Sequence, residues 1–197
     1  MSHEFHNDES VLVHLEYFAD RLNLVFSYFF CTLEFRDDED FVGEPGKSDR
    51  TWALKTIQNA CLHTTLIALR DLDDFLRPRT LHSEADDLKA SDFGFPNPAS
   101  FLATSEREAI NKNIVHSTLR GVDAVGFRWD VFELATKGIR QAMQFLEWAE
   151  KHFGSEKNYA VTRINAYVCR RKTQEIYDYI RKEVEKHRAK RDETANV

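Results

Sequence analysis

The 197-residue chain contains only seven glycines and four prolines, the residues that supply most tight turns. Short strands joined by many turns, as in a sandwich or a barrel, are therefore not expected. Leucine, alanine, glutamate, lysine and arginine are plentiful instead, and they favour helices. The chain is long enough to bury one substantial core, and nothing in it forces a second, so we expect a single domain over residues 1–197.

Long hydrophobic runs are also missing. No segment approaches the roughly eighteen apolar residues of a membrane-spanning helix, and the nearest, LNLVFSYFFCTLEF at 22–35, is short and interrupted by polar residues. The first ten residues, MSHEFHNDES, are polar and acidic, whereas an export signal needs a basic end and an apolar centre. These features predict a soluble, cytoplasmic protein that does not engage a membrane.

Cysteine is scarce. Cys31, Cys61 and Cys169 are odd in number and widely spaced, and each falls on the apolar face of an expected helix. This pattern predicts buried thiols in a reducing cytoplasm, with neither a disulfide nor a CxxC metal site.

Two common site patterns are absent. A di-iron bundle needs Glu-x-x-His pairs, and the sequence contains none, so we expect no metal and no cofactor. The stretch GEPGKS at 43–48 resembles a phosphate-binding loop, but Phe41 stands where that pattern requires glycine, and no strand precedes it.

The formal net charge of −6 argues against a protein coated in positive charge for bulk nucleic-acid binding. Positive charge is nevertheless concentrated between Arg170 and Arg191, where nine basic residues accompany four acidic ones. This stretch is either a basic arm that approaches an anionic partner or a solvated helix whose charges pair at i,i+4.

Apolar residues recur at spacings of three and four in five segments, which predicts five helices. The expected helices span about 8–33, 48–77, 104–121, 129–153 and 155–184. The long connection over 78–100 contains FGFPNP, which is incompatible with regular helix, and residues 185–197 are expected to fray. The fold class is therefore all-α, a bundle of about five helices with an aromatic core, and any apolar helix face left uncovered would serve self-association.

The stretch LRDLDDFL at 69–76 places Arg70 within helical reach of Asp73 and Asp74. One interpretation is a structural ion pair at the edge of the bundle. The other is a partly buried Arg70 that orders the following loop or lines a cleft.

The polar segment INKNIVHST at 110–118 carries a single histidine inside the third expected helix. On a helical wheel Ile110 and Ile114 cluster on one side and His116 falls almost opposite, so His116 points away from the core. It is either an ordinary surface histidine or a proton-transfer group. Metal-free RNA cleavage needs an acid, a base and donors around the phosphate, and two copies facing each other across a twofold axis would supply both proton-transfer roles.

This segment, on a helix that follows a long loop, resembles the HEPN superfamily, whose signature is arginine, four to six residues, then histidine. It is more narrowly similar to abortive-infection-type HEPN proteins, in which a tryptophan-led helix with an Arg/Leu/Asp stretch precedes a loop and an NK-x-x-x-H run. The parallels are Trp52, ALRDLDDFL at 68–76, and Asn111-Lys112 with His116. By architecture the likeness covers about residues 10–185.

The resemblance implies a HEPN-like homodimer whose motif helices lie near a shared cleft. It implies either a metal-independent endoribonuclease or a non-catalytic RNA-binding module, in a phage-defence, toxin–antitoxin or stress setting with a possible cognate antitoxin or defence partner. This chain departs from the signature because Asn111 stands where arginine is expected, and Arg107 lies on the opposite helix face.

In the catalytic interpretation His116 transfers protons, Lys112 neutralises phosphate charge, and Asn111 or Asn113 orients the substrate. RNA contacts would come from Arg70, Asn113 and Arg120. The alternative is a non-catalytic helical protein-interaction module whose polar segment is a hydrated face or a dimer contact.

Overall fold

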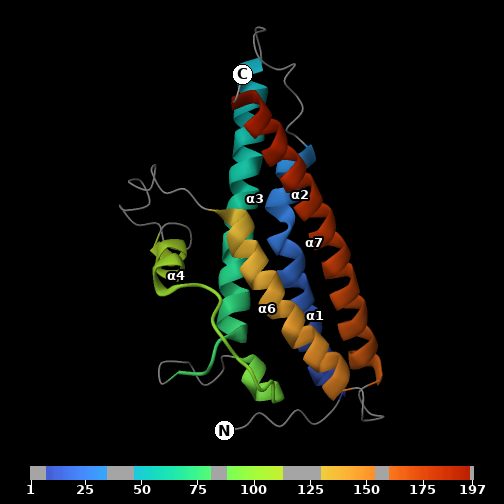
Figure 1. The fold of residues 1–197 in the computed structure, drawn as a ribbon. Coiled ribbons are helices and arrows are strands. Elements are labelled where there is room, and N and C mark those ends of the chain that lie inside the picture. Colours follow the sequence, from blue (N-terminus) through green and yellow to red (C-terminus); the bar gives the residue numbers. More distant parts are fainter. Residues whose placement is uncertain (1–7, 35–46, 81–87, 113–129, 154–159, 196–197) are drawn as a thin grey trace.

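The computed structural model describes residues 8–34, 47–80, 88–112, 130–153 and 160–195 (Figure 1). Every regular element in these ranges is helical, which confirms the expected all-α fold. The elements are α1 (Asp8–Val25), α2 (Ser27–Glu34), α3 (Lys47–Leu76), the short 3-10 helix η2 (Ala90–Phe93), α4 (Thr104–Ile110), α6 (Val131–His152) and α7 (Ala160–Ala195).

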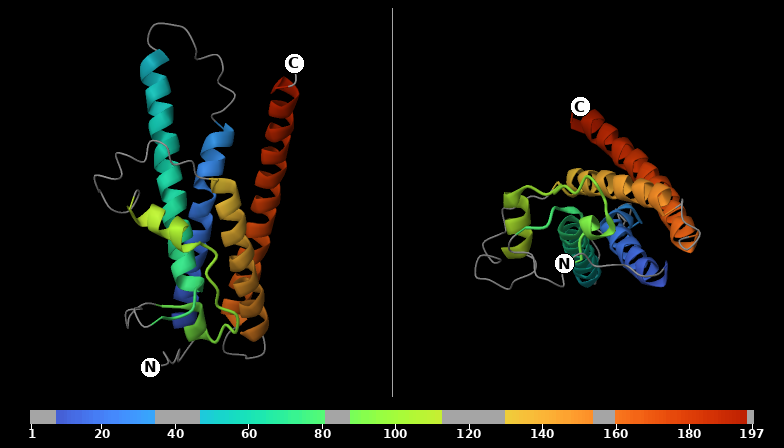
Figure 2. Two further views of the ribbon diagram at one scale, coloured as in Figure 1. Left: turned by 60° about the vertical axis from the view of Figure 1, so that its left-hand side comes forward. Right: turned by 90° about the horizontal axis from the view of Figure 1, so that it is seen from below.

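Four long helices form the bundle. α1 and α7 run in one direction, and α3 and α6 run in the other (Figure 1). Within the bundle each of these helices packs mainly against two others, in the order α3, α1, α7, α6 and back to α3. The short α4 stands outside this bundle beside α3, on the side away from α7 (Figure 2). The molecule therefore has two separate lateral surfaces, one at α4 and one at α7.

The first expected helix is divided at Phe26 into α1 and α2. Thr65 on α3, fully buried, lies against the break: its hydroxyl accepts from the Tyr28 backbone N–H at 3.2 Å and lies 3.3 Å from the backbone oxygens of Leu24 and Val25. These contacts satisfy backbone groups that a continuous helix would pair internally. The break thus depends on a side chain about forty residues away in the sequence.

Aromatic rings fill the core between α1, α3 and α6, which confirms the expected aromatic core. The Phe145 ring lies 5.0 Å from that of Phe18 and 5.1 Å from that of Phe75, both edge-on. Phe95, from the segment after η2, packs on Phe145 at 5.5 Å. Edge-to-face pairs of this kind add to the stabilisation from burial alone.

The segment that follows α3 is held against the end of that helix. The backbone N–H of Ala99 donates to the Leu76 carbonyl at 2.9 Å, and the buried Lys89 ammonium donates to the Asp74 carbonyl at 2.8 Å. Both contacts satisfy carbonyls that the last turn of a helix leaves open. Gly94 adopts a left-handed conformation, φ 87°, and ends η2.

α7 differs from the expectation in two respects. It continues to Ala195, beyond Val184, where the apolar spacing thins. Its buried face carries Ala166, Thr173 and Ile180 at intervals of seven residues, whereas three apolar positions of the expected helix, Ile164, Val168 and Tyr179, are exposed.

Candidate functional site

α4, which leads into the polar segment 110–118, is anchored to α3 by a buried charge pair. Arg107 on α4 is ion-paired with Asp73 on α3, whose carboxylate is completely buried. Asp73 also accepts from the Ser100 hydroxyl at 2.9 Å and from the backbone N–H groups of Phe101 and Leu102 at 2.8 and 3.0 Å. One carboxylate therefore fixes both the connection before α4 and α4 itself.

A second pair ties α4 to α6. Glu106 accepts from the Ala103 backbone N–H at 2.7 Å, where it satisfies the start of the helix, and its other oxygen lies 3.3 Å from the Lys137 ammonium. The carboxylates of Glu133 and Glu106 raise the pKa of Lys137 through hydrogen bonds and charge. Because a seven-residue helix is marginal by itself, these tertiary contacts hold α4 in place.

Asn111 and Lys112, the first two residues of the Asn-Lys-x-x-x-His run, follow α4 directly. Asn111 continues α4 in a single π turn with Lys112, and the Asn111 Oδ1 is enclosed without a hydrogen-bond donor among the described residues. Lys112 is exposed and pairs with Glu108 at 3.0 Å, both side chains being about half accessible to water. Asn111 therefore faces the protein, while Lys112 faces solvent.

The other predicted site residues are His116, Asn113, Arg120 and Arg70. His116, Asn113 and Arg120 lie outside the described residues. Arg70 lies on α3 and pairs with Asp71 at 3.6 Å and with Asp74 at 3.7 Å. The predicted pairing with Asp74 is thus confirmed, whereas the proximity of Arg70 to Asp73 leads to no pair.

Asp73 pairs with Arg107 because of helix geometry. Residues two apart on a helix point about 200° apart, so Asp71 and Asp73 face opposite sides of α3. Asp71 faces α1, where Arg21 lies 3.5 Å away, and Asp73 faces α4. Residues 100–102, at the end of the connection before α4, are therefore held by Asp73 and not by Arg70.

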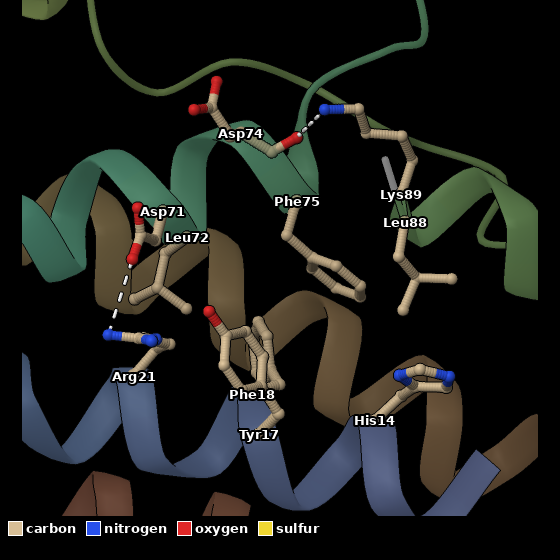
Figure 3. Close-up of a pocket in the computed structure, with 10 residues that line it drawn as sticks. All are labelled: His14, Tyr17, Phe18, Arg21, Asp71, Leu72, Asp74, Phe75, Leu88 and Lys89. Atoms are coloured by element: carbon tan, nitrogen blue, oxygen red, sulfur yellow. Dashed lines mark hydrogen bonds and ion pairs between the residues drawn. The ribbon is translucent and has the colours of Figure 1, made fainter. Parts of the chain in front are cut away.

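A cavity of about 260 Å³ lies between α1, α3 and the start of the next segment (Figure 3). Aromatic and aliphatic side chains line its middle, and charged groups stand at its ends. Its lining residues include His14, Tyr17, Arg21, Asp71, Phe75 and Lys89. Sequence reasoning missed this cavity because its walls come from three segments, none of which carries a recognisable motif.

Electrostatics at the cavity are balanced. The Arg21 guanidinium lies over the Tyr17 ring, 4.6 Å from its centroid, and also neighbours Asp71. Burial raises the pKa of Asp71 above its ordinary value of 3.8, and the positive charges of Arg21 and Arg70 partly oppose that shift. The negative charge of Asp71 is therefore accompanied by the positive charges of Arg21 and Arg70 at this end of the cavity.

The basic stretch at the end of the chain is largely paired where it is described. Arg171 pairs with Glu175 at 2.9 Å, Arg181 with Glu185 at 3.7 Å, and Lys186 with Glu183 at 3.4 Å. These local pairs favour the solvated-helix interpretation of this stretch over a continuous basic arm.

The described residues contain no cluster of three or more histidine, cysteine, aspartate or glutamate side chains suited to a metal ion. Within the same part of the chain, no helix combines the length and hydrophobicity needed to cross a bilayer. Comparisons with protein-family models, with curated proteins and with solved structures find no match for this chain.

Proposed function

We propose that this chain is a HEPN-like RNA-binding protein, with the RNA site at the end of α4 and in the segment that follows it. The observation that carries the proposal is the anchoring of α4. A helix of seven residues is fixed to α3 through Arg107 and Asp73 and to α6 through Glu106 and Lys137. This arrangement holds the start of the Asn-Lys-x-x-x-His run at a defined place beside the bundle.

Lys112 is the phosphate-binding residue in this proposal. Its pair with Glu108 is exposed on both sides, and such i,i+4 pairs contribute only about 0.3–0.5 kcal/mol. The contact with Glu108 therefore opposes phosphate binding only weakly. Arg107 is unsuited to this role because its partner Asp73 is buried, and separating a buried pair is far more costly.

The placement of Asn111 favours RNA binding over RNA cleavage. In the signature an arginine occupies this position, whereas here the side-chain oxygen of Asn111 is enclosed by the protein. A side-chain oxygen enclosed in this way does not reach a scissile phosphate. The chain would then recognise RNA without the cation that the signature supplies for catalysis.

The test is RNA binding by the full chain, measured by fluorescence anisotropy with a labelled single strand over a salt series. Lys112→Ala should weaken binding several-fold and reduce the salt slope by about 0.7, the value for one lost phosphate contact on a single strand. Lys151→Ala is the matched control, because Lys151 forms the same exposed i,i+4 pair with Glu147 on α6. Equal affinity of the two variants, or no binding by the wild type, would reject the proposal.

The same RNA examined for cleavage separates the two versions of the function. We expect intact RNA, and no difference in growth upon expression, for wild type and His116→Ala alike. Cleavage by the wild type that His116→Ala abolishes would restore the catalytic version.

A further inference from the structure

We propose that the outer face of α7 is a self-complementary surface through which two copies of this chain pair antiparallel about a twofold axis. The surface is a single i,i+4 row on the exposed side of α7. Its four members are Tyr167, Arg171, Glu175 and Tyr179. This inference does not depend on the proposed RNA binding, because α4 takes no part in it.

All four side chains of the row are exposed. Tyr167 and Tyr179 are 42% and 53% accessible, and the side chains of Arg171 and Glu175 are 67% and 63% accessible. Tyrosine is enriched at protein interfaces relative to the rest of the protein surface. Ile164 and Val168, also exposed, extend the apolar area at the N-terminal end of the row.

The row is symmetric about the position opposite Thr173, which is buried on the inner face of α7. At about 100° per residue, Arg171 and Glu175 lie roughly 20° to either side of the outward direction, and the two tyrosines lie roughly 60° to either side. A twofold axis through this point places Arg171 against the partner's Glu175. It also places Tyr167 against the partner's Tyr179.

Charge and apolar character both match under this operation. The order along the row is tyrosine, arginine, glutamate, tyrosine. An antiparallel second copy therefore places a glutamate opposite each arginine at the centre and a tyrosine opposite each tyrosine at the ends. Rows of i,i+4 residues form the ridges that interdigitate when two helices cross, at about −50° in the commonest class. The row spans twelve residues, or roughly 18 Å of helix.

The row is also held in place on its own subunit. The Arg170 guanidinium lies over the Tyr167 ring, 6.0 Å from its centroid, and is paired at 2.9 Å with Glu150 on α6. Arg171 pairs with Glu175 along the helix. Side chains already ordered in the free protein lose less conformational entropy when a second copy binds.

The position of α7 has a consequence for the assembly. α7 and α4 lie on opposite sides of the bundle (Figure 2), so the proposed contact turns the two α4 ends outward. This dimer differs from the one expected from the family resemblance, in which the motif helices share a cleft. Two RNA sites facing away from each other would bind separate segments of one strand.

The experiment measures the mass of the full chain in solution by sedimentation over a concentration series. Wild type should form a dimer, and Arg171→Glu should raise the dimer dissociation constant at least tenfold, because the new carboxylate faces the partner's Glu175. Glu175→Arg should do the same. An equimolar mixture of these two variants should restore the dimer, because each then presents the charge that the other lacks.

Arg181→Glu is the matched control. Arg181 and Glu185 form the same kind of i,i+4 pair on α7 but lie outside the row, so this variant should dimerise like wild type. A monomeric wild type, unimpaired dimerisation of Arg171→Glu, or failure of the mixture to recover the dimer would overturn the proposal.

Discussion

The guanidinium of Arg107 on α4 is ion-paired with the fully buried carboxylate of Asp73 on α3. Asp73 also holds Ser100, Phe101 and Leu102, so four donors from the connection and from α4 converge on one side chain. A buried carboxylate is costly to desolvate, and this number of donors offsets the cost. Asp73 is therefore the residue through which the α4 surface is attached to the bundle.

Asp73→Ala should destabilise the fold strongly, because it leaves the charge of Arg107 and two backbone N–H groups without their acceptor. We expect a loss of about 3–4 kcal/mol in the free energy of unfolding, measured by urea denaturation. Arg107→Leu should cost less, because Asp73 keeps its other three donors. Asp20→Ala, at an exposed position of α1, should change stability by no more than about 0.5 kcal/mol. Similar losses for Asp73→Ala and Asp20→Ala would contradict this account of the attachment.

Local spacing predicted the pair of Arg70 with Asp74, because residues four apart on a helix are always neighbours. It did not predict that Asp73 turns to Arg107, a residue 34 positions further along the chain. Helical wheels contain no information about which tertiary neighbour stands opposite a given face.

Gly138 provides a second prediction. A Cβ atom at this position of α6 would lie 2.8 Å from a Leu69 methyl carbon and 3.0 Å from the Phe101 ring. Overpacking should therefore destabilise the Gly138→Ala protein by roughly 1–3 kcal/mol. The better helix propensity of alanine should offset up to about 1 kcal/mol of this loss. Gln144→Ala, on the exposed side of the same helix, should be neutral or slightly stabilising. Thermal unfolding followed by circular dichroism would distinguish the two variants, and a Gly138→Ala protein more stable than wild type would refute the close approach.

Asp71 should make the protein less stable as pH rises from acid toward neutral. Burial raises its pKa in the folded state above 3.8, so in this window the unfolded chain releases the proton first and stability falls with increasing pH. Asp71→Asn lacks this titration. Its free energy of unfolding should therefore improve relative to wild type between about pH 3 and about pH 6.

Glu147→Gln is the control of opposite sign. Lys151 lowers the pKa of Glu147 below 4.5 through a hydrogen bond and charge, so the contribution of Glu147 is present above that value and is lost as pH falls. The free energy of unfolding of Glu147→Gln should thus fall slightly relative to wild type as pH rises over the same interval. Parallel pH profiles for both variants would contradict the assignment for Asp71.

Sequence periodicity predicted most of the helices because it reflects burial along each segment. Ala135, Ile139 and Leu146, spaced by four and seven residues on α6, are buried. The break at Phe26 and the exposure of Ile164 depend on which helices lie alongside, and that information is not local. For the site, the sequence offered Asn111 and Lys112 as candidates, and these two residues follow α4 directly. The cavity beside His14 required the assembled bundle.

The thiol of Cys169 should be slow to react in the folded protein. Cys61 and Cys169 are both free, and they are only partly buried, whereas buried thiols were expected. Burial nevertheless raises the pKa of Cys169 above 9.0, while Thr173 and Lys172 oppose the shift, so fewer molecules carry the reactive thiolate at pH 8. In a chain with Cys31→Ser and Cys61→Ser, alkylation by iodoacetamide should be at least tenfold slower in buffer than in urea. Glutathione alkylated under both conditions corrects for the solvent, and equal rates in the two solvents would show that the fold does not protect this thiol.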